Sequence, residues 1–140
     1  GSPSLLNLEM FKDPFAYQLK VQEGDEFVQR NVDLVETFNY LLGIKVNKVR
    51  FLEKDKCSYC AVLGEKMGRR IAIVWRPTVD MEEDKSKLMA DKEFIEGTVL
   101  PALLGEGSKP DRLLVNGPCY AEGVEAIEPE FKRLMFSGVI

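Results

Sequence analysis

The sequence contains no histidine, which is the residue that most often acts as a general base or binds a transition metal in proteins. This absence excludes a Ser-His-Asp catalytic set and any zinc site that depends on imidazole. Long apolar runs are missing as well, so no segment has the length that a membrane-spanning helix needs. No signal peptide opens the chain, and we expect no association with a membrane.

Cysteine is scarce, and three cysteines cannot form a complete disulfide framework, which favours a reducing, cytoplasmic location. Cys57 and Cys60 form a C-x-x-C, but only Cys119 remains to complete a zinc site. A redox pair would begin a helix, where the thiol pKa is lowered. The run CSYCAVLG instead predicts a strand with the two thiols on opposite faces, so we interpret the cysteines as packing residues.

The chain has 140 residues and 45% hydrophobic content, which is enough for one domain with a real core. Its formal net charge is −4, which argues against a domain that binds nucleic acid by unspecific phosphate neutralisation, although a local basic patch is compatible with that total. We interpret residues 1–3, Gly-Ser-Pro, as a cleavage scar and residues 4–140 as a single module.

The first third of the chain predicts a strand, a capped helix and a second strand. Residues 15–21 alternate between apolar and polar side chains, as a half-buried strand does. Asp33 and Glu36 have the spacing of a helix-capping box, and Gly43 supplies the left-handed residue that ends the helix. The strand after Gly43 changes phase near residues 47–48, which predicts a β-bulge.

Three consecutive strands are expected at residues 44–51, 58–63 and 69–76, and the short turns between them predict an antiparallel meander. The last of them, RRIAIVWR, has an unbroken apolar centre and is therefore expected to be buried on both faces, with Trp75 in the core.

Helical spacing returns at residues 87–104, where Gly97 and Pro101 weaken the interior of the helix or mark its end. A strand at residues 112–116 and a helix at residues 128–136 follow. A helical crossover favours parallel pairing of the strands that it connects. The fold class is therefore α+β, one domain with a mixed sheet of about four to five strands in the order β-α-β-β-β-α-β-α.

Helix, three strands, helix, strand is also the layout of nucleases that resemble the PD-(D/E)xK superfamily. Their sites need an acidic residue on the second core strand and an acid-x-Lys pair on the third, to hold a divalent metal. Here the second strand offers Ser58, Cys60 and Val62, and the third offers residues 74–76, Val-Trp-Arg. The metal-binding set is missing, so this alternative is a degenerate nuclease-like fold that acts as a DNA-binding module.

Six blocks in a fixed order resemble the C-terminal region of adenine-specific DNA methyltransferases, similar to the methylation subunit of type III restriction–modification systems. The resemblance spans residues 13 to 136. The blocks are DPFAYQLKV (13–21), VDLVETFNYLLGIKV (32–46), RRIAIVWR (69–76), DKEFIE (91–96), DRLLVNG (111–117) and EPEFKRLMF (128–136).

The resemblance implies a prokaryotic parent enzyme whose catalytic domain lies upstream and uses S-adenosylmethionine. Such enzymes place a flipped adenine in an Asp/Asn-Pro-Pro-Tyr/Phe motif and hold the cofactor with a Phe-x-Gly-x-Gly loop. This chain has neither motif, and residues 13–17, DPFAY, lack the second proline. No catalytic, cofactor-binding or metal-binding residue is carried over, so the chain itself is expected to be neither an enzyme nor a cofactor protein.

Two tasks fit such a module. The first is to position duplex DNA through phosphate contacts, although for any single cation a simple coating of the sheet surface is the more economical interpretation. The candidate DNA-contact residues are Lys45, Lys48, Arg50, Arg69, Arg70 and Arg76. The second task is assembly with the methyltransferase domain, a second copy of the subunit or the restriction subunit, to which the apolar residues 134–136 could contribute. We rank assembly slightly above DNA contact.

Overall fold

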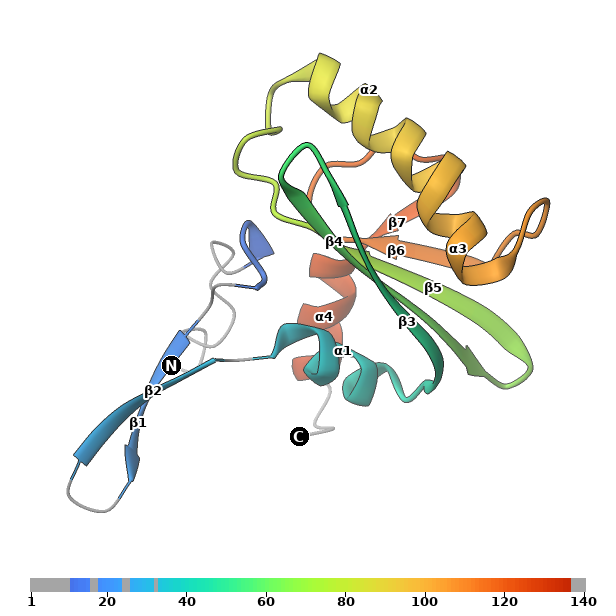
Figure 1. The fold of residues 1–140 in the computed structure, drawn as a ribbon. Helices are drawn as coiled ribbons and strands as arrows, with labels where there is room; N and C mark the ends of the chain where they lie inside the picture. Colours follow the sequence, from blue (N-terminus) through green and yellow to red (C-terminus); the bar gives the residue numbers. More distant parts are fainter. Residues whose placement is uncertain (1–10, 16–17, 24–25, 32, 137–140) are drawn as a thin grey trace.

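The computed structural model describes residues 11–15, 18–23, 26–31 and 33–136. The predicted scar at residues 1–3 and part of the first predicted strand lie outside these residues. Within them, a five-stranded mixed sheet has helices on both faces, and a two-stranded hairpin stands apart from it (Figure 1). The α+β class and the mixed sheet are thus confirmed. No helix of the described chain is long and apolar enough to cross a membrane.

The hairpin consists of β1 (Gln18–Glu23) and β2 (Glu26–Asn31), which pair antiparallel and project away from the body of the molecule (Figure 1). The sequence pattern does not predict β2. Its sequence, EFVQRN, places its two strongly apolar residues next to each other and therefore lacks the alternation that marks a half-buried strand.

Helix α1 (Leu34–Leu42) begins and ends where the sequence predicts. The Asp33 carboxylate accepts a hydrogen bond from the Glu36 backbone N–H at 3.0 Å, which satisfies one of the free donors of the first turn. Gly43 has a φ of 75°, and its N–H donates to the carbonyls of Asn39 and Tyr40. A left-handed residue turns the chain sharply at this point, so the next strand can begin two residues after the helix.

Strands β3 (Lys45–Lys54), β4 (Cys57–Lys66) and β5 (Arg69–Trp75) form the predicted antiparallel meander. The β3–β4 register shifts between Val46 and Lys48, which confirms the predicted bulge.

The crossover from β5 consists of three helical segments: α2 (Lys85–Phe94), a π-helical turn η3 (Ile95–Val99) and α3 (Leu100–Leu104). Proline at position 101 has no N–H to continue the α-helical hydrogen bonds. The helix widens just before it, where the Leu100 N–H donates to the Ile95 carbonyl, five residues back.

Strand β6 (Arg112–Val115) pairs parallel to β5, as the helical crossover predicts. A fifth strand, β7 (Val124–Ala126), pairs parallel to β6 and was not predicted because three residues carry no readable alternation. Helix α4 (Ile127–Met135) follows at once and tolerates Pro129 in its first turn. The sheet order is β3-β4-β5-β6-β7, with β3 and β7 at the edges.

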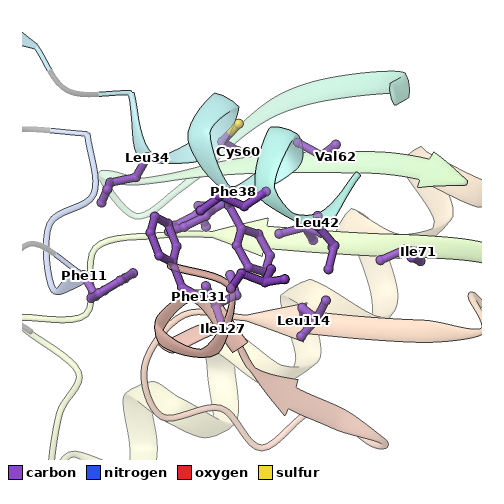
Figure 2. Close-up of a cluster of buried hydrophobic side chains, with 14 residues drawn as sticks. Phe11, Leu34, Phe38, Leu42, Cys60, Val62, Ile71, Leu114, Ile127 and Phe131 are labelled. Atoms are coloured by element: carbon purple, nitrogen blue, oxygen red, sulfur yellow. The ribbon is translucent and has the colours of Figure 1, made fainter. Parts of the chain in front are cut away.

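Two hydrophobic clusters hold the layers together, one on each face of the sheet. On the face covered by α1 and α4, Phe38 packs between helix and sheet, with its ring centroid 5.6 Å from that of Phe131 and 5.9 Å from that of Trp75 (Figure 2). The opposite face packs under η3 and α3, where Ile95 and Val99 are fully buried. Trp75 is a core residue, as expected.

The cysteines confirm the alternation of β4. Cys60 belongs to the cluster under α1 and α4, whereas Cys57 packs against the cluster on the other face. Two of the three C-terminal apolar residues close the core of the domain itself, since Leu134 is buried and Met135 packs against the same cluster, whereas Phe136 is exposed. A partner surface built on all three is therefore not available.

Candidate functional site

Strand β3 is the long exposed edge of the sheet. It has ten residues and, among the described strands, pairs with β4 alone, whereas β7 at the other edge has three residues. No residue of β3 is buried, and most are exposed. An edge strand leaves alternate backbone N–H and C=O groups unpaired, so β3 offers a continuous backbone surface as well as its side chains.

One face of β3 carries a row of cations. Lys48 pairs with Leu63 and Arg50 with Ala61, and both β4 residues belong to the side of the sheet covered by α3. Lys45 extends this row beyond the bulge. Among the described residues neither Lys45 nor Lys48 forms an ion pair, so their charges are available to a partner. We call these three residues the cationic row.

The other face of β3 carries an apolar row of Val46, Val49 and Phe51, whose exposed fractions are 41%, 39% and 79%. Val49 and Phe51 pair with core residues of β4 on the side covered by α1. A groove of about 650 Å³ separates this row from α1. Its walls are formed by Pro14, Phe15, Asp33, Val35, Glu36, Asn39, Val46, Val49, Phe51 and Cys60.

Two other predicted DNA-contact residues lie away from this edge. Arg70 is two strands from β3, and its guanidinium donates to the Lys109 carbonyl at 2.9 Å, while its backbone N–H donates to Asp111 at 2.8 Å. Arg69 is its neighbour on β5 and therefore points to the opposite face of the sheet. The structure thus brings together three of the six predicted cations.

Arg76 is a correction to the prediction. Its side chain is fully buried, and its guanidinium forms a bidentate pair with Asp91, with Nε 3.0 Å from Oδ1 and Nη2 2.8 Å from Oδ2. Nη1 donates to the Asn116 carbonyl, and Nη2 also donates to the Pro118 carbonyl. A guanidinium whose three nitrogens are all hydrogen-bonded in the interior cannot bind DNA phosphate. The sequence carried no local signal for this pairing, because Asp91 lies on a different element.

Arg76 is the centre of a buried polar cluster. The Tyr59 hydroxyl donates to the Asp91 carboxylate at 2.7 Å, and the Asn116 amide donates to the carbonyls of Phe11 and Arg76 at 2.7 and 2.8 Å. Burial alone would lower the pKa of Arg76, but the hydrogen bonds and charge of Asp91 outweigh it and hold the pKa above its ordinary value. The cluster joins β4, the residue that follows β5, α2 and the loop after β6.

A pocket of about 590 Å³ lies beside this cluster, between the β3–β4 turn and α2. Tyr59 and Asp91 contribute to its wall together with Lys54, which donates to the Ala90 carbonyl at 3.3 Å. The described residues contain no group of three side chains that could hold a metal ion. Arg76, at the position of the lysine in an acid-x-Lys pair, makes a structural ion pair here, so the nuclease-like layout extends only to the order of the elements.

The thiols have the properties of packing residues. Burial raises the pKa of Cys57 and Cys119, and burial together with the charge of Asp33 raises the pKa of Cys60 to about 11. Thiols of this kind are protonated near neutral pH and are therefore poor nucleophiles and metal ligands.

No protein-family model, no curated protein and no solved structure matches this chain. The features of the chain that bear on function are therefore the exposed β3 edge, with its cationic and apolar rows, and the ordered sequence blocks.

Proposed function

We propose that this chain is a non-catalytic module of an adenine-specific DNA methyltransferase, similar to the C-terminal region of type III methylation subunits, and that its task is assembly. The ordered sequence blocks support the family part of the proposal, and one structural observation carries the assembly part: β3 is a ten-residue sheet edge with an apolar row on one face and a cationic row on the other. The partners are proteins of the same complex: the S-adenosylmethionine-dependent catalytic domain, the restriction subunit or a second copy.

The apolar row supports a protein partner. Phe51 exposes 79% of its surface and Val49 exposes 39%, and both border the groove beside α1. Contiguous exposed apolar groups next to a concave surface are typical of protein interfaces, because burying them removes apolar area from water. Aromatic residues in such positions often contribute a large part of the binding energy.

Positioning of DNA is the second candidate, and the cationic row favours it. Lys45, Lys48 and Arg50 lie on one face of one strand, and phosphate contacts of this kind fix a protein on a duplex without reading its sequence. The degenerate nuclease-like interpretation leads to the same expectation. The formal net charge of −4 and the interior position of Arg76 weaken this candidate relative to assembly.

Complex formation with the catalytic polypeptide and the restriction subunit from the same source tests assembly. We expect a complex in size-exclusion chromatography with light scattering, and we expect Val49→Ser with Phe51→Ser to weaken it by at least about tenfold. Met67→Ser is the matched control, because Met67 is 93% exposed in the β4–β5 turn. The proposal is contradicted if the chain forms no complex with the catalytic polypeptide, none with the restriction subunit and no dimer with itself, or if both variants lose binding equally.

Fluorescence anisotropy of a labelled duplex tests the second candidate. Binding that falls steeply between about 50 and 200 mM salt and is lost in Lys45→Glu with Lys48→Glu would favour DNA positioning. No binding at tens of micromolar in low salt would remove this candidate and leave assembly.

A further inference from the structure

We infer that β3 accepts an added β-strand from a partner protein, and that this strand alternates acidic and apolar residues. The inference rests on the proposed assembly function and deepens it, because it names the kind of segment that binds and the groups that recognise it. The partner is an extended protein segment that joins the sheet next to β3.

The backbone of β3 provides the first part of the recognition. Its ten residues pair on one side with β4, and the other side has no neighbouring strand among the described elements. The Val49 carbonyl accepts a hydrogen bond from the guanidinium of the adjacent Arg50 at 3.0 Å, so a local side chain covers part of the edge. A partner strand can offer N–H groups in place of such a contact and bond the remaining free groups.

The two faces of β3 set the sequence of the partner. Side chains of an added strand alternate between the two faces of the sheet, so every second residue lies beside the cationic row and the others lie beside the apolar row. Carboxylates next to Lys48 and Arg50 form opposite-charge pairs across the strands. Apolar side chains on the other face cover Val49 and Phe51 and reach the groove beside α1.

The groove holds one further group that suits a polar partner. The side-chain oxygen of Asn39 is buried and has no hydrogen-bond partner among the residues that the structure describes. Asn39 lines the groove from α1. Buried acceptors are nearly always bonded in native structures, so a donor from the incoming segment would complete this site.

Charge argues against a second copy as the occupant of this edge. If β3 paired with its own copy, Lys45, Lys48, Arg50 and Lys54 of one strand would face the same row of the other, and like charges across strands are destabilising. The bulge between Val46 and Lys48 twists one end of the edge and also opposes regular self-pairing. An acidic strand reverses the sign of the charge contact and needs only the regular half of β3.

DNA also fits the charge of the cationic row, but it uses neither of the other two features. Phosphates do not complete a strand edge, and the apolar row with its groove would remain exposed to water. A segment of protein is the one class of partner that uses the backbone, the cations and the apolar side chains together.

A synthetic peptide of alternating glutamate and valine, about eight residues long, is the direct probe. Nuclear magnetic resonance of the ¹⁵N-labelled chain follows the titration. We expect amide shifts in β3 and at the α1 side of the groove, saturating below about 1 mM peptide. The same peptide with N-methylated amides on one edge must bind at least about tenfold more weakly, because strand addition needs those N–H groups.

Charge reversal on the protein tests the charge contact in a way that a misfolded variant could not imitate, because one peptide should lose binding and another should gain it. Lys48→Glu with Arg50→Glu should lose the glutamate–valine peptide and gain a lysine–valine peptide, whereas Lys109→Glu with Lys132→Glu, at two exposed positions outside β3, should change neither. The inference is overturned if the N-methylated peptide binds equally well, if no β3 amide responds at about 1 mM, or if a DNA duplex is the ligand that shifts those amides. Loss of peptide binding with an intact complex would reject strand addition and leave the assembly function in place.

Discussion

The Arg76–Asp91 pair is the residue-scale feature on which the domain depends most. Replacing Arg76 by methionine would leave the Asp91 carboxylate buried without its counter-ion, and the Asn116 and Pro118 carbonyls without their donors. We expect the free energy of unfolding to fall by about 3–5 kcal/mol in urea denaturation, since breaking a buried pair costs more than the pair itself contributes.

Two further variants separate charge from packing at this site. Arg76→Met with Asp91→Leu removes both charges and should be more stable than Arg76→Met alone, because no uncompensated carboxylate is left. Arg133→Met removes the exposed pair with Glu130 and should hardly change the urea midpoint. Equal loss in the single and the double variant would show that shape, and not the unpaired charge, determines the effect.

Glu128 makes stability depend on pH. Burial raises the pKa of its carboxyl above the ordinary value of 4.5, although the Gly117 N–H, 2.7 Å from Oε2, opposes the shift. The folded chain therefore binds this proton more tightly than the unfolded chain, and the free energy of unfolding falls as pH rises from about 4.5 to the raised folded pKa.

Glu128→Gln should remove this fall in the free energy of unfolding. In urea denaturation the variant should therefore become more stable relative to the parent as pH rises through that interval. Met67→Gln, which changes an exposed side chain without a titratable group, is the control, and its profile should run parallel to that of the parent at every pH. A Glu128→Gln profile parallel to that of the parent would mean that the carboxyl titrates alike in both states.

At this scale the sequence predicted the residues whose role depends on near neighbours in the chain. Asp33 begins α1 and Gly43 ends it, each through contacts within four residues. The alternation of side chains around Cys60 determines on which face of the sheet its thiol lies. Arg76 could not be assigned in this way, because its partners Asp91 and Asn116 are 15 and 40 residues away and meet it only in the folded sheet.

At the scale of elements, the junction of α1 and β3 constrains β4. A Cβ atom on Gly64 would lie 2.6 Å from Ile44 Cδ1 and 3.1 Å from the Lys45 carbonyl. Gly64→Ala should therefore destabilise the domain by about 1–3 kcal/mol in urea unfolding, because a packed core accepts added volume poorly.

Gly97 is the matched control, since a Cβ there would meet nothing within 4 Å and the residue belongs to the helical crossover. Gly97→Ala should leave stability unchanged or raise it by up to about 1 kcal/mol, because alanine is the better helix former. If Gly97→Ala lost stability and Gly64→Ala did not, the close packing at Gly64 and the open space at Gly97 would both be contradicted.

Helices and strands could be predicted where the apolar pattern of a segment agreed with the turn or cap residues at its ends. The meander and the parallel crossover follow from apolar runs separated by short turns or by a helix. Strands β2 and β7 were missed because one has no alternation and the other has three residues. The π-helical turn has a readable cause in Pro101, although the sequence indicated only a weakness there.

At the scale of the whole molecule, the strand order determines which surface is available. The buried strand β5 at the centre could be recognised from its sequence, but the sequence does not say which strands lie at the edges of the sheet. Lys45, Lys48 and Arg50 become a surface only because β3 is an edge, and the groove exists only because α1 packs beside it. The sequence therefore predicted which cations belong to the candidate site, but not their arrangement on one strand edge or the groove next to it.

The edge position of β3 gives its charges a second consequence, which is protection against self-pairing. Lys48→Thr with Arg50→Thr keeps strand propensity but removes two of the like charges that oppose a β3–β3 contact between molecules. We expect this variant to self-associate in sedimentation velocity as its concentration rises from about 10 to 500 µM, a range that resolves micromolar affinities, whereas the parent shows no association through this edge. Adding Phe51→Ser should reverse the association, because it removes the most exposed apolar side chain of the same strand. If the parent associates as strongly as the Thr variant, the cationic row does not oppose self-association, and β3 would be a surface for a second copy.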